Sequence, residues 1–192
     1  MLTIPFPHDQ LQTFFISQEF STGPIIKNIL EETKKIAELT YGDNTQGMIS
    51  IGFGKRTIAT AESTPFKTIQ PEHLIEVVDY DATKQILLVM GKKEPIKDVA
   101  VHWIIHHAKN EIGIIVYLKD TEENEQLTSS ISHINAIPHG SILDRSKTIL
   151  KALQKQKTLY LEGEGIFLTG RTISEVQQQL LHFRGHRHED RR

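Results

Sequence analysis

Apolar positions recur at helical spacing early in the chain, between Ile25 and Leu39. They form one stripe, while lysines and glutamates fill the opposite side, which is typical of an amphipathic helix packed on a core. The turn-forming residues 41–44 follow and end this predicted helix. The apolar stripe consists of Ile26, Ile29, Leu30, Ile36 and Leu39.

Short runs of β-branched and apolar residues come next, and they predict strands. Met48–Ile51 and Thr57–Thr60 flank the tetrapeptide Gly52–Lys55, which contains two glycines and is typical of a hairpin turn. Two further strands are predicted at Leu74–Val78 and Ile86–Met90. The first half of the chain therefore predicts a helix followed by several short strands.

The segment 92–120 organises the rest of the pattern. Its apolar positions predict a helix over Asp98–Ala108, and the β-branched run Gly113–Leu118 predicts an interior strand. Asp98, the first residue of this helix, has two candidate roles. Its side chain either caps the free backbone N–H groups at the helix start or acts as an acid in a functional site. Polar residues spaced by four positions share one face of this helix: Asp98, His102 and His106.

The last third of the chain predicts smaller elements. These are a strand at Ile134–Ile137, a short helix at Ser146–Gln154 and two strands around the turn 163–165. Thr172 and Glu175 have the spacing of a capping box, which predicts a last helix over Thr172–Phe183. The remaining segments predict a loosely packed arm at residues 1–20, an exposed acidic stretch at 121–126 and a charged tail at 185–192.

Composition narrows the class of protein. A chain of 192 residues with 38% hydrophobic and 24% charged residues predicts one globular domain with a substantial core. A net charge of -2 gives no general attraction to nucleic acid or to an anionic membrane. The absence of cysteine excludes disulfides and thiolate metal sites and favours a cytoplasmic protein, and no apolar run is long enough to predict a membrane span or a signal sequence.

Five motifs occur in an order and spacing that resemble the class II aldolase/adducin family. The resemblance extends from Ile25 to Leu181. Each motif alone is a weak indication of the family, but their order and spacing together strongly indicate its fold. The motifs are TQGMISI at 45–51, ATAES at 59–63, IQPEHLIEVVD at 69–79, PIKD at 95–98 and GEGIFLTGRTISEV at 163–176. The resemblance implies an α/β protein with a three-layer α/β/α arrangement and a largely antiparallel central sheet. It also implies a homo-oligomer with sites between subunits.

The same resemblance assigns candidate site residues. Asp98 falls on the family's catalytic acid and His102 on a helix histidine, while Tyr117, Lys119 and Glu164 fall on the three zinc-binding histidines. Zinc sites take imidazole, thiolate or carboxylate ligands, and only Glu164 belongs to these types. We therefore expect no cofactor, and zinc or another divalent metal only if the site is rebuilt from other residues. An ion pair between Lys119 and Glu164 would then replace the metal.

A second group of matched residues lies on the family's phosphate-binding loops. Hydroxyl and N–H donors remain at several positions, although Met48 and Glu62 replace a family Asn and Ser. A carboxylate near a phosphate is unfavourable by roughly 4 kcal/mol per pair of charges at close range. The candidate substrate-binding residues are Thr45, Gly47, Ser50, Thr60, Ser63 and Thr64.

These residues leave more than one function open. The first hypothesis is a ligand-binding or interaction module that has lost the family's metal chemistry, with a small sugar-phosphate-like ligand. The alternative is a metal-independent lyase or epimerase acting on a small sugar phosphate, with catalytic residues Asp98, Lys119 and His102: Asp98 as acid and base, and a buried Lys119 as electrophile. A purely structural oligomer subunit is a further hypothesis. His102 is better explained as a structural or leftover pocket histidine than as a metal ligand.

Overall fold

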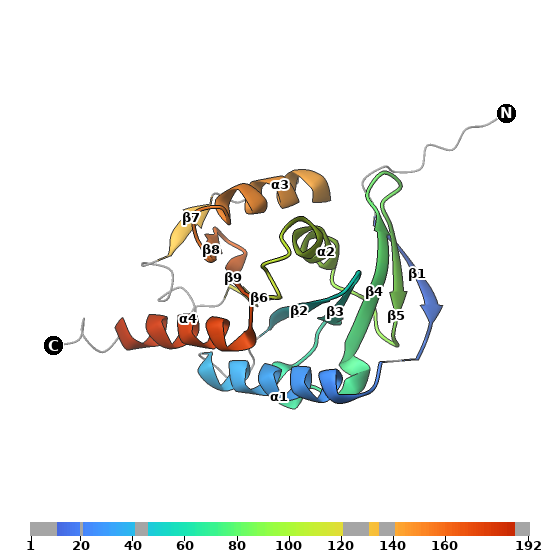
Figure 1. Cartoon of the computed structure of the whole chain (residues 1–192), viewed down its shortest axis with the longest axis horizontal. Coiled ribbons are helices and arrows are strands. Elements are labelled where there is room, and N and C mark those ends of the chain that lie inside the picture. Colours follow the sequence, from blue (N-terminus) through green and yellow to red (C-terminus); the bar gives the residue numbers. More distant parts are fainter. Residues whose placement is uncertain (1–10, 20, 41–45, 121–130, 135–140, 187–192) are drawn as a thin grey trace.

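The computed structural model describes residues 11–19, 21–40, 46–120, 131–134 and 141–186. These residues form a central sheet with helices on both faces (Figure 1). Helices α1 (Pro24–Leu39) and α4 (Ile173–His186) pack on one face, and α2 (Val99–Ala108) and α3 (Ile142–Ala152) pack on the other. This arrangement confirms the predicted three-layer α/β/α class. No helix in the described segments is long and apolar enough to cross a membrane.

The sheet has nine strands in the described residues, and most neighbouring pairs are antiparallel. The two outermost pairs, β1 with β5 and β7 with β8, are parallel. The strands lie in the order β1 (Gln12–Ser17), β5 (Ile86–Met90), β4 (Leu74–Asp81), β3 (Arg56–Thr60), β2 (Gly47–Phe53), β6 (Ile114–Lys119), β9 (Gly165–Gly170), β8 (Thr158–Leu161) and β7 (Ser132–Ile134). Short 3-10 turns, Phe66–Thr68 and Pro71–His73, connect β3 to β4.

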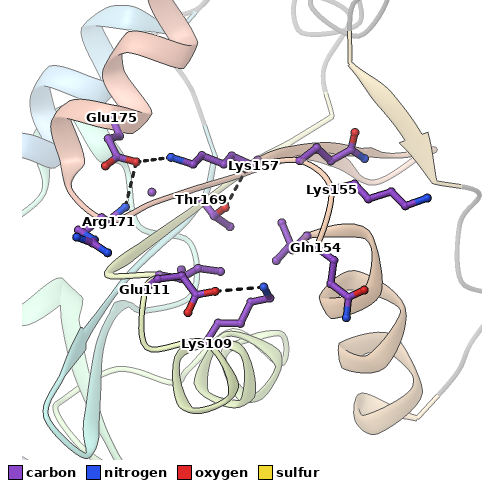
Figure 2. Close-up of a pocket in the computed structure, with 12 residues that line it drawn as sticks. Lys109, Glu111, Gln154, Lys155, Lys157, Thr169, Arg171 and Glu175 are labelled. Atoms are coloured by element: carbon purple, nitrogen blue, oxygen red, sulfur yellow. Dashed lines mark hydrogen bonds and ion pairs between the residues drawn. The ribbon is translucent and has the colours of Figure 1, made fainter.

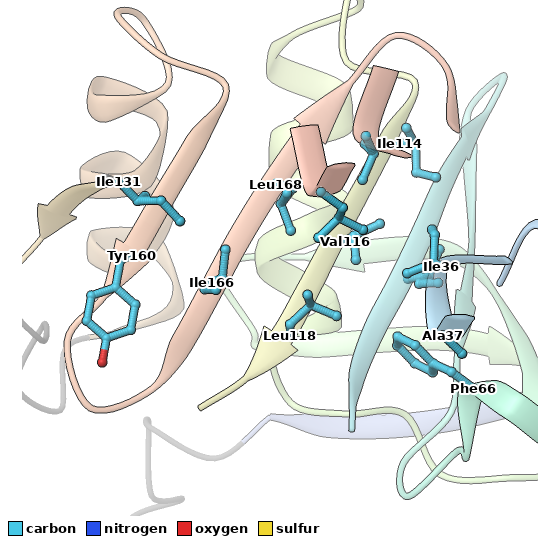
Figure 3. Packing of buried hydrophobic residues seen from close by; sticks show 13 residues of the cluster. Ile36, Ala37, Phe66, Ile114, Val116, Leu118, Ile131, Tyr160, Ile166 and Leu168 are labelled. Atoms are coloured by element: carbon cyan, nitrogen blue, oxygen red, sulfur yellow. The ribbon is translucent and has the colours of Figure 1, made fainter. Parts of the chain in front are cut away.

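Strand β6 lies between β2 and β9 and divides its side chains between the two helical layers. Neighbouring side chains on a strand point to opposite faces. Ile114, Val116 and Leu118 therefore pack toward α1 and α4 (Figure 3), whereas Ile115 belongs to the cluster that packs against α2 and α3. All four are at most 1% exposed, and burial of each stabilises the fold by roughly 1.5–3 kcal/mol. The β-branched run therefore forms an interior strand, as its sequence predicts.

Several predicted boundaries differ from the structure. Residues 12–17 of the expected arm form strand β1, paired with β5. Helix α3 starts at Ile142, earlier than predicted, because Ser141 caps it by accepting a hydrogen bond from the Asp144 N–H at 3.2 Å. Of the predicted strand at Ile134–Ile137, only Ile134 belongs to the described residues, and it lies in β7, which also includes Ser132 and His133. Residues 135–137 lie outside the described residues, as do 121–126 and most of the tail.

The two predicted helix caps also differ. Asp98 precedes α2, but its side chain makes no capping hydrogen bond and instead accepts from Arg145. Thr172 accepts from the Glu175 N–H at 3.4 Å, as a capping box requires. The Glu175 carboxylate, however, bonds Lys157 and the Arg171 N–H rather than the backbone of Thr172. Only half of the predicted box is therefore present.

A buried hydrogen-bond chain holds α2 against β2. The Ser50 hydroxyl lies 2.8 Å from His102 Nδ1 and 2.9 Å from His106 Nε2, and His106 Nδ1 lies 3.1 Å from the Ile112 carbonyl oxygen. The carbonyl can only accept, so His106 Nδ1 carries a proton and neutral His106 accepts at Nε2 from the Ser50 O–H. Ser50 in turn accepts from His102 Nδ1–H. Each tautomer in the chain is thus fixed by the next group.

Burial lowers the pKa of both histidines, that of His106 to about 4, and that of His102 well below its ordinary value. Their unfolded-state pKa is near 6.5, so the unfolded chain binds more protons than the folded chain at acidic pH. The stability that the two neutral histidines contribute is therefore fully present above about pH 6.5 and is lost as the pH falls toward 4.

We predict that the free energy of unfolding falls between about pH 7 and pH 5, and that His106→Gln removes about 2 kcal/mol of this fall, since glutamine does not titrate. Urea unfolding at each pH measures the effect. His182→Gln, which changes an exposed histidine on α4, should leave the pH dependence unaltered. An identical pH dependence in the wild type and His106→Gln would contradict the assignment of a buried neutral imidazole.

Candidate functional site

A cavity of about 280 Å³ opens where β6 ends and α2 begins. Four segments that are distant in sequence form its wall: the start of β2, the loop after β3, the approach to α2 and the end of β6. The lining residues are Gln46, Gly47, Glu62, Ser63, Thr64, Ile96, Asp98, Tyr117 and Lys119. The cavity therefore brings together Asp98, two of the three zinc-matched positions and part of the predicted phosphate loops.

Backbone geometry shapes one wall of the cavity. A Cβ atom on Gly47 would lie 1.9 Å from the Tyr117 carbonyl oxygen, so only glycine allows β2 to approach β6 here. Ser63 has a φ of 55°, a left-handed conformation that is uncommon outside glycine. The loop is tied down on both sides of Ser63, since the Glu62 N–H bonds the Glu94 carbonyl at 2.9 Å and the Thr64 hydroxyl bonds the Ala61 carbonyl at 2.8 Å. Such an outlier in an anchored loop is typical of a binding site.

Arg145, from α3, joins two of the matched positions. Its guanidinium donates to Asp98 Oδ2 at 3.1 Å and to both carboxylate oxygens of Glu164, the first at 2.9 Å from Nη1. The Arg145 side chain is 14% exposed, against 34% for Asp98 and 27% for Glu164. A planar guanidinium that meets a carboxylate through two nitrogens fixes orientation as well as charge. Glu164 is thus paired with Arg145, where the sequence suggested Lys119.

Tyr117 completes this cluster from β6. Its hydroxyl donates to the Glu164 carbonyl oxygen at 2.7 Å, and the Asp120 N–H bonds the same oxygen at 2.8 Å. Burial, followed by the nearby Asp98 and Glu164 carboxylates, raises the pKa of Tyr117. The phenol therefore stays protonated and acts as a donor, which holds the turn between β8 and β9 in place.

Asp98 lies in the cavity wall. Burial raises the pKa of its carboxyl, and the Arg145 guanidinium opposes that rise without cancelling it. A carboxyl whose pKa is raised by burial beside a cavity is a candidate for proton transfer. The prediction that this residue faces a site together with Tyr117 and Lys119 is consistent with the cavity lining.

The other predicted catalytic residues are placed differently. Lys119 lines the cavity but is exposed, so it lacks the buried setting expected for a Schiff-base lysine. His102 is 1% exposed and does not line the cavity; its Nδ1 bonds Ser50, and its Nε2 has no hydrogen-bond partner among the described residues. The structural reading of His102 therefore fits better than a catalytic one.

The predicted substrate-binding set divides in the same way. Gly47, Ser63 and Thr64 line the cavity. Ser50 is buried between the histidines, and the Thr60 hydroxyl accepts from the Ile49 N–H at 3.1 Å inside the core, so neither faces the cavity. Thr45 lies outside the described residues.

Arg145 was missed by the sequence reasoning, although a signal was present. Ser141 and Asp144 have cap spacing that would start the helix before Arg145. The longer helix places Arg145 four residues before the buried Ile149, on the face that packs inward. A charged residue on a buried face implies a buried partner of opposite charge.

Within the described segments, no group of three or more His, Asp or Glu residues is arranged to hold a metal ion.

Comparisons with known proteins agree with this fold. The family model for the class II aldolase and adducin N-terminal domain matches residues 27–124. No curated protein matches the chain by sequence.

Solved structures with this fold are similar over nearly the whole chain. An L-fuculose 1-phosphate aldolase superimposes with a TM-score of 0.63 at 14% identity, covering 88% of this chain and 89% of that one. A sugar-phosphate aldolase from Thermotoga maritima gives 0.62 at 14% identity, with 82% and 89% covered. The N-terminal class II aldolase domain of a Thermoplasma acidophilum protein gives 0.61 at 11% identity, with 92% and 98% covered. The family match, over half of the chain, and the shared fold lead to one conclusion: this chain belongs to the class II aldolase and adducin N-terminal domain family.

Proposed function

We propose that this chain is a ligand-binding module of the class II aldolase fold, in which the Arg145 guanidinium takes the place of the family's zinc ion. The observation that carries the proposal is the pairing of Arg145 with both Asp98 and Glu164. Asp98 matches the family acid and Glu164 matches a family metal ligand. A fixed cation therefore bridges two positions that would surround a metal.

The donor set does not fit a zinc ion. Zinc binds imidazole, thiolate or carboxylate groups. At the three matched positions, the Tyr117 hydroxyl is a protonated donor, Lys119 is a cation, and the Glu164 carboxylate already binds a guanidinium. A guanidinium stays charged at any ordinary pH, so it also repels a divalent cation from the same space.

Charge balance favours binding over carbon–carbon cleavage. Retro-aldol chemistry on a sugar phosphate needs positive charge to stabilise an enediolate, which a divalent metal supplies. Here one guanidinium faces two carboxylates, so the cluster of Arg145, Asp98 and Glu164 carries no excess positive charge when both acids are ionised. Such a cluster orders the cavity wall but stabilises a developing oxyanion weakly.

The cavity suits a small hydroxylated molecule with an anionic group. Among the described residues that line it, Lys119 supplies a cation, and Ser63 supplies a hydroxyl on an anchored loop. The lining offers both hydrogen-bond donors and acceptors, with Glu62 and Asp98 as acceptors, and this combination matches a polyol. A small sugar phosphate with its phosphate near Lys119 is the ligand we infer.

One observation favours the alternative function, a metal-independent lyase or epimerase. Asp98 lines the cavity with a raised pKa, as a general acid or base does. If purified protein cleaves or epimerises a ketose phosphate without added metal, and Asp98→Asn abolishes the reaction, the chain is an enzyme.

We predict that Arg145→Met lowers the free energy of unfolding by roughly 2 kcal/mol, between the values typical of exposed and buried pairs, because two carboxylates lose their counterion. The double variant Arg145→Met with Glu164→Gln should recover part of the loss. Urea unfolding measures each variant. Lys147→Met removes an exposed pair on the same helix and should change stability by at most about 0.5 kcal/mol. Additive losses in the double variant would count against the cluster.

We predict that dihydroxyacetone phosphate raises the melting temperature and that Lys119→Gln abolishes the rise, because the cavity loses its cation. Lys147→Gln, which removes an exposed charge elsewhere, should keep the rise. Zinc should neither bind stoichiometrically nor be required, as measured by calorimetric titration and elemental analysis. Zinc bound at one ion per chain and lost in Glu164→Ala would refute the guanidinium site, and an unchanged response in Lys119→Gln would refute the ligand pose.

We also infer a homo-oligomer, which the family resemblance implies. Edge strand β1 exposes two large apolar side chains, with Phe14 50% and Ile16 56% exposed. An uncovered apolar edge strand favours association. Light scattering at micromolar concentration should give a multiple of the chain mass, and Phe14→Ser with Ile16→Ser should lower it if this edge is the interface. A monomeric wild type would exclude the prediction.

A further inference from the structure

A second cavity, of about 520 Å³, lies at the opposite end of strands β6 and β9 from the candidate site. It opens where β6 begins and β9 ends, between the C-terminal ends of α2 and α3 and the start of α4. The two cavities share no lining residue among those described. The proposed function does not use this second cavity, so it needs its own explanation.

The second cavity is rich in cationic side chains. Its lining holds Lys109, Lys155, Lys157 and Arg171 against two carboxylates, Glu111 and Glu175. Two internal ion pairs satisfy both acids: Lys109 Nζ lies 3.2 Å from Glu111, and Lys157 Nζ lies 2.8 Å from Glu175. Figure 2 shows these pairs on opposite sides of the opening.

The four cations outnumber the two carboxylates, and the other two cations are Lys155 and Arg171. Hydrogen bonds lower the pKa of the Glu111 and Glu175 carboxyls, and the Arg171 guanidinium lies near enough to both to help lower that pKa. Among the described residues, no carboxylate lies within ion-pair distance of Lys155 or of the Arg171 guanidinium, and both residues are exposed. Arg171 lies on the α4 side of the opening and Lys155 on the α3 side (Figure 2). Partial negative charge from the ends of α2 and α3 offsets part of the positive charge. Some of these end carbonyls are, however, already bonded, as in Lys155 N–H to Ala152 at 3.1 Å.

The floor of the cavity is apolar. Ile112 and Leu153 line it and each remain 8% exposed, and Gln154 and Gln156 are further lining residues. A volume of this size is within the range of pockets that hold small organic ligands. Apolar lining together with cations at the opening matches a molecule with an apolar body and an anionic group.

We propose that this cavity binds a small organic anion, whose apolar body contacts Ile112 and Leu153 and whose anionic group is attracted by the cations at the opening, Arg171 on the α4 side and Lys155 on the α3 side. The anionic group can be a phosphate or a carboxylate, since both accept the forked hydrogen bonds of a guanidinium. Thr169 does not contribute a free hydroxyl, because its Oγ1 donates to the Lys157 carbonyl at 3.0 Å. Specificity therefore rests on charge and on the apolar floor.

The test compares charged probes with neutral partners of the same shape. Adenosine 5′-monophosphate is compared with adenosine for the phosphate arm, and benzoate with benzyl alcohol for the carboxylate arm, by ligand-observed NMR and calorimetric titration. We expect at least one anion to bind and its neutral partner to bind about tenfold more weakly or not at all. The arm that binds identifies the source of the charge. Failure of both anions to bind the intact 192-residue chain would overturn the proposal.

Variants locate the binding. Arg171→Gln with Lys155→Gln should weaken the bound anion about tenfold. A matched control that also removes two charges, Lys84→Gln with Lys147→Gln, changes exposed lysines elsewhere and should preserve the affinity. Lys119→Gln should also preserve it, because that residue lines the other cavity. Loss in Lys119→Gln, or equal weakening in the two double variants, would overturn this site without bearing on the proposed function.

Discussion

The ion cluster around Arg145 is the interaction on which the candidate site depends. It joins α3 to the start of α2 through Asp98 and to the turn between β8 and β9 through Glu164. Tyr117 then links the same turn to β6. Because these segments are distant in sequence, nothing local holds them in register at the cavity. The guanidinium supplies both the counter-charge and the geometry that bring two carboxylates close to each other.

The parts of the fold that the sequence predicts are those with a strong local pattern. Helix α1, the hairpin of β2 and β3, strand β5 and strand β6 all have periodicity or turn residues that identify them. Strand β1 was not predicted, because a short parallel edge strand is defined by its distant partner β5 and not by its own turn chemistry. The apolar pattern alone predicts too late a start for α3, because the helix begins at the polar Ser141 cap that precedes this pattern.

The candidate site was predictable in part for the same reason. Motif order placed Asp98, Tyr117 and Lys119 together, and all three line one cavity. The motif does not show which hydroxyls face that cavity. It therefore predicts Ser50 and Thr60 as substrate-binding residues, although both hydroxyls make hydrogen bonds inside the core. Arg145 belongs to no motif. Its role follows only from a long-range pairing that balances two acids.

A guanidinium and a metal ion place different demands on a site. A bound metal exchanges with solution and carries two charges, whereas Arg145 is covalently fixed and carries one, which its two carboxylates already offset. Binding at the neighbouring cavity would then be insensitive to chelators. It would instead depend on Lys119 and on the protonation of Asp98, whose pKa burial raises. Since protonation of Asp98 removes a negative charge from the wall, an anionic ligand should bind more tightly as the pH falls through that pKa, until its own anionic group becomes protonated.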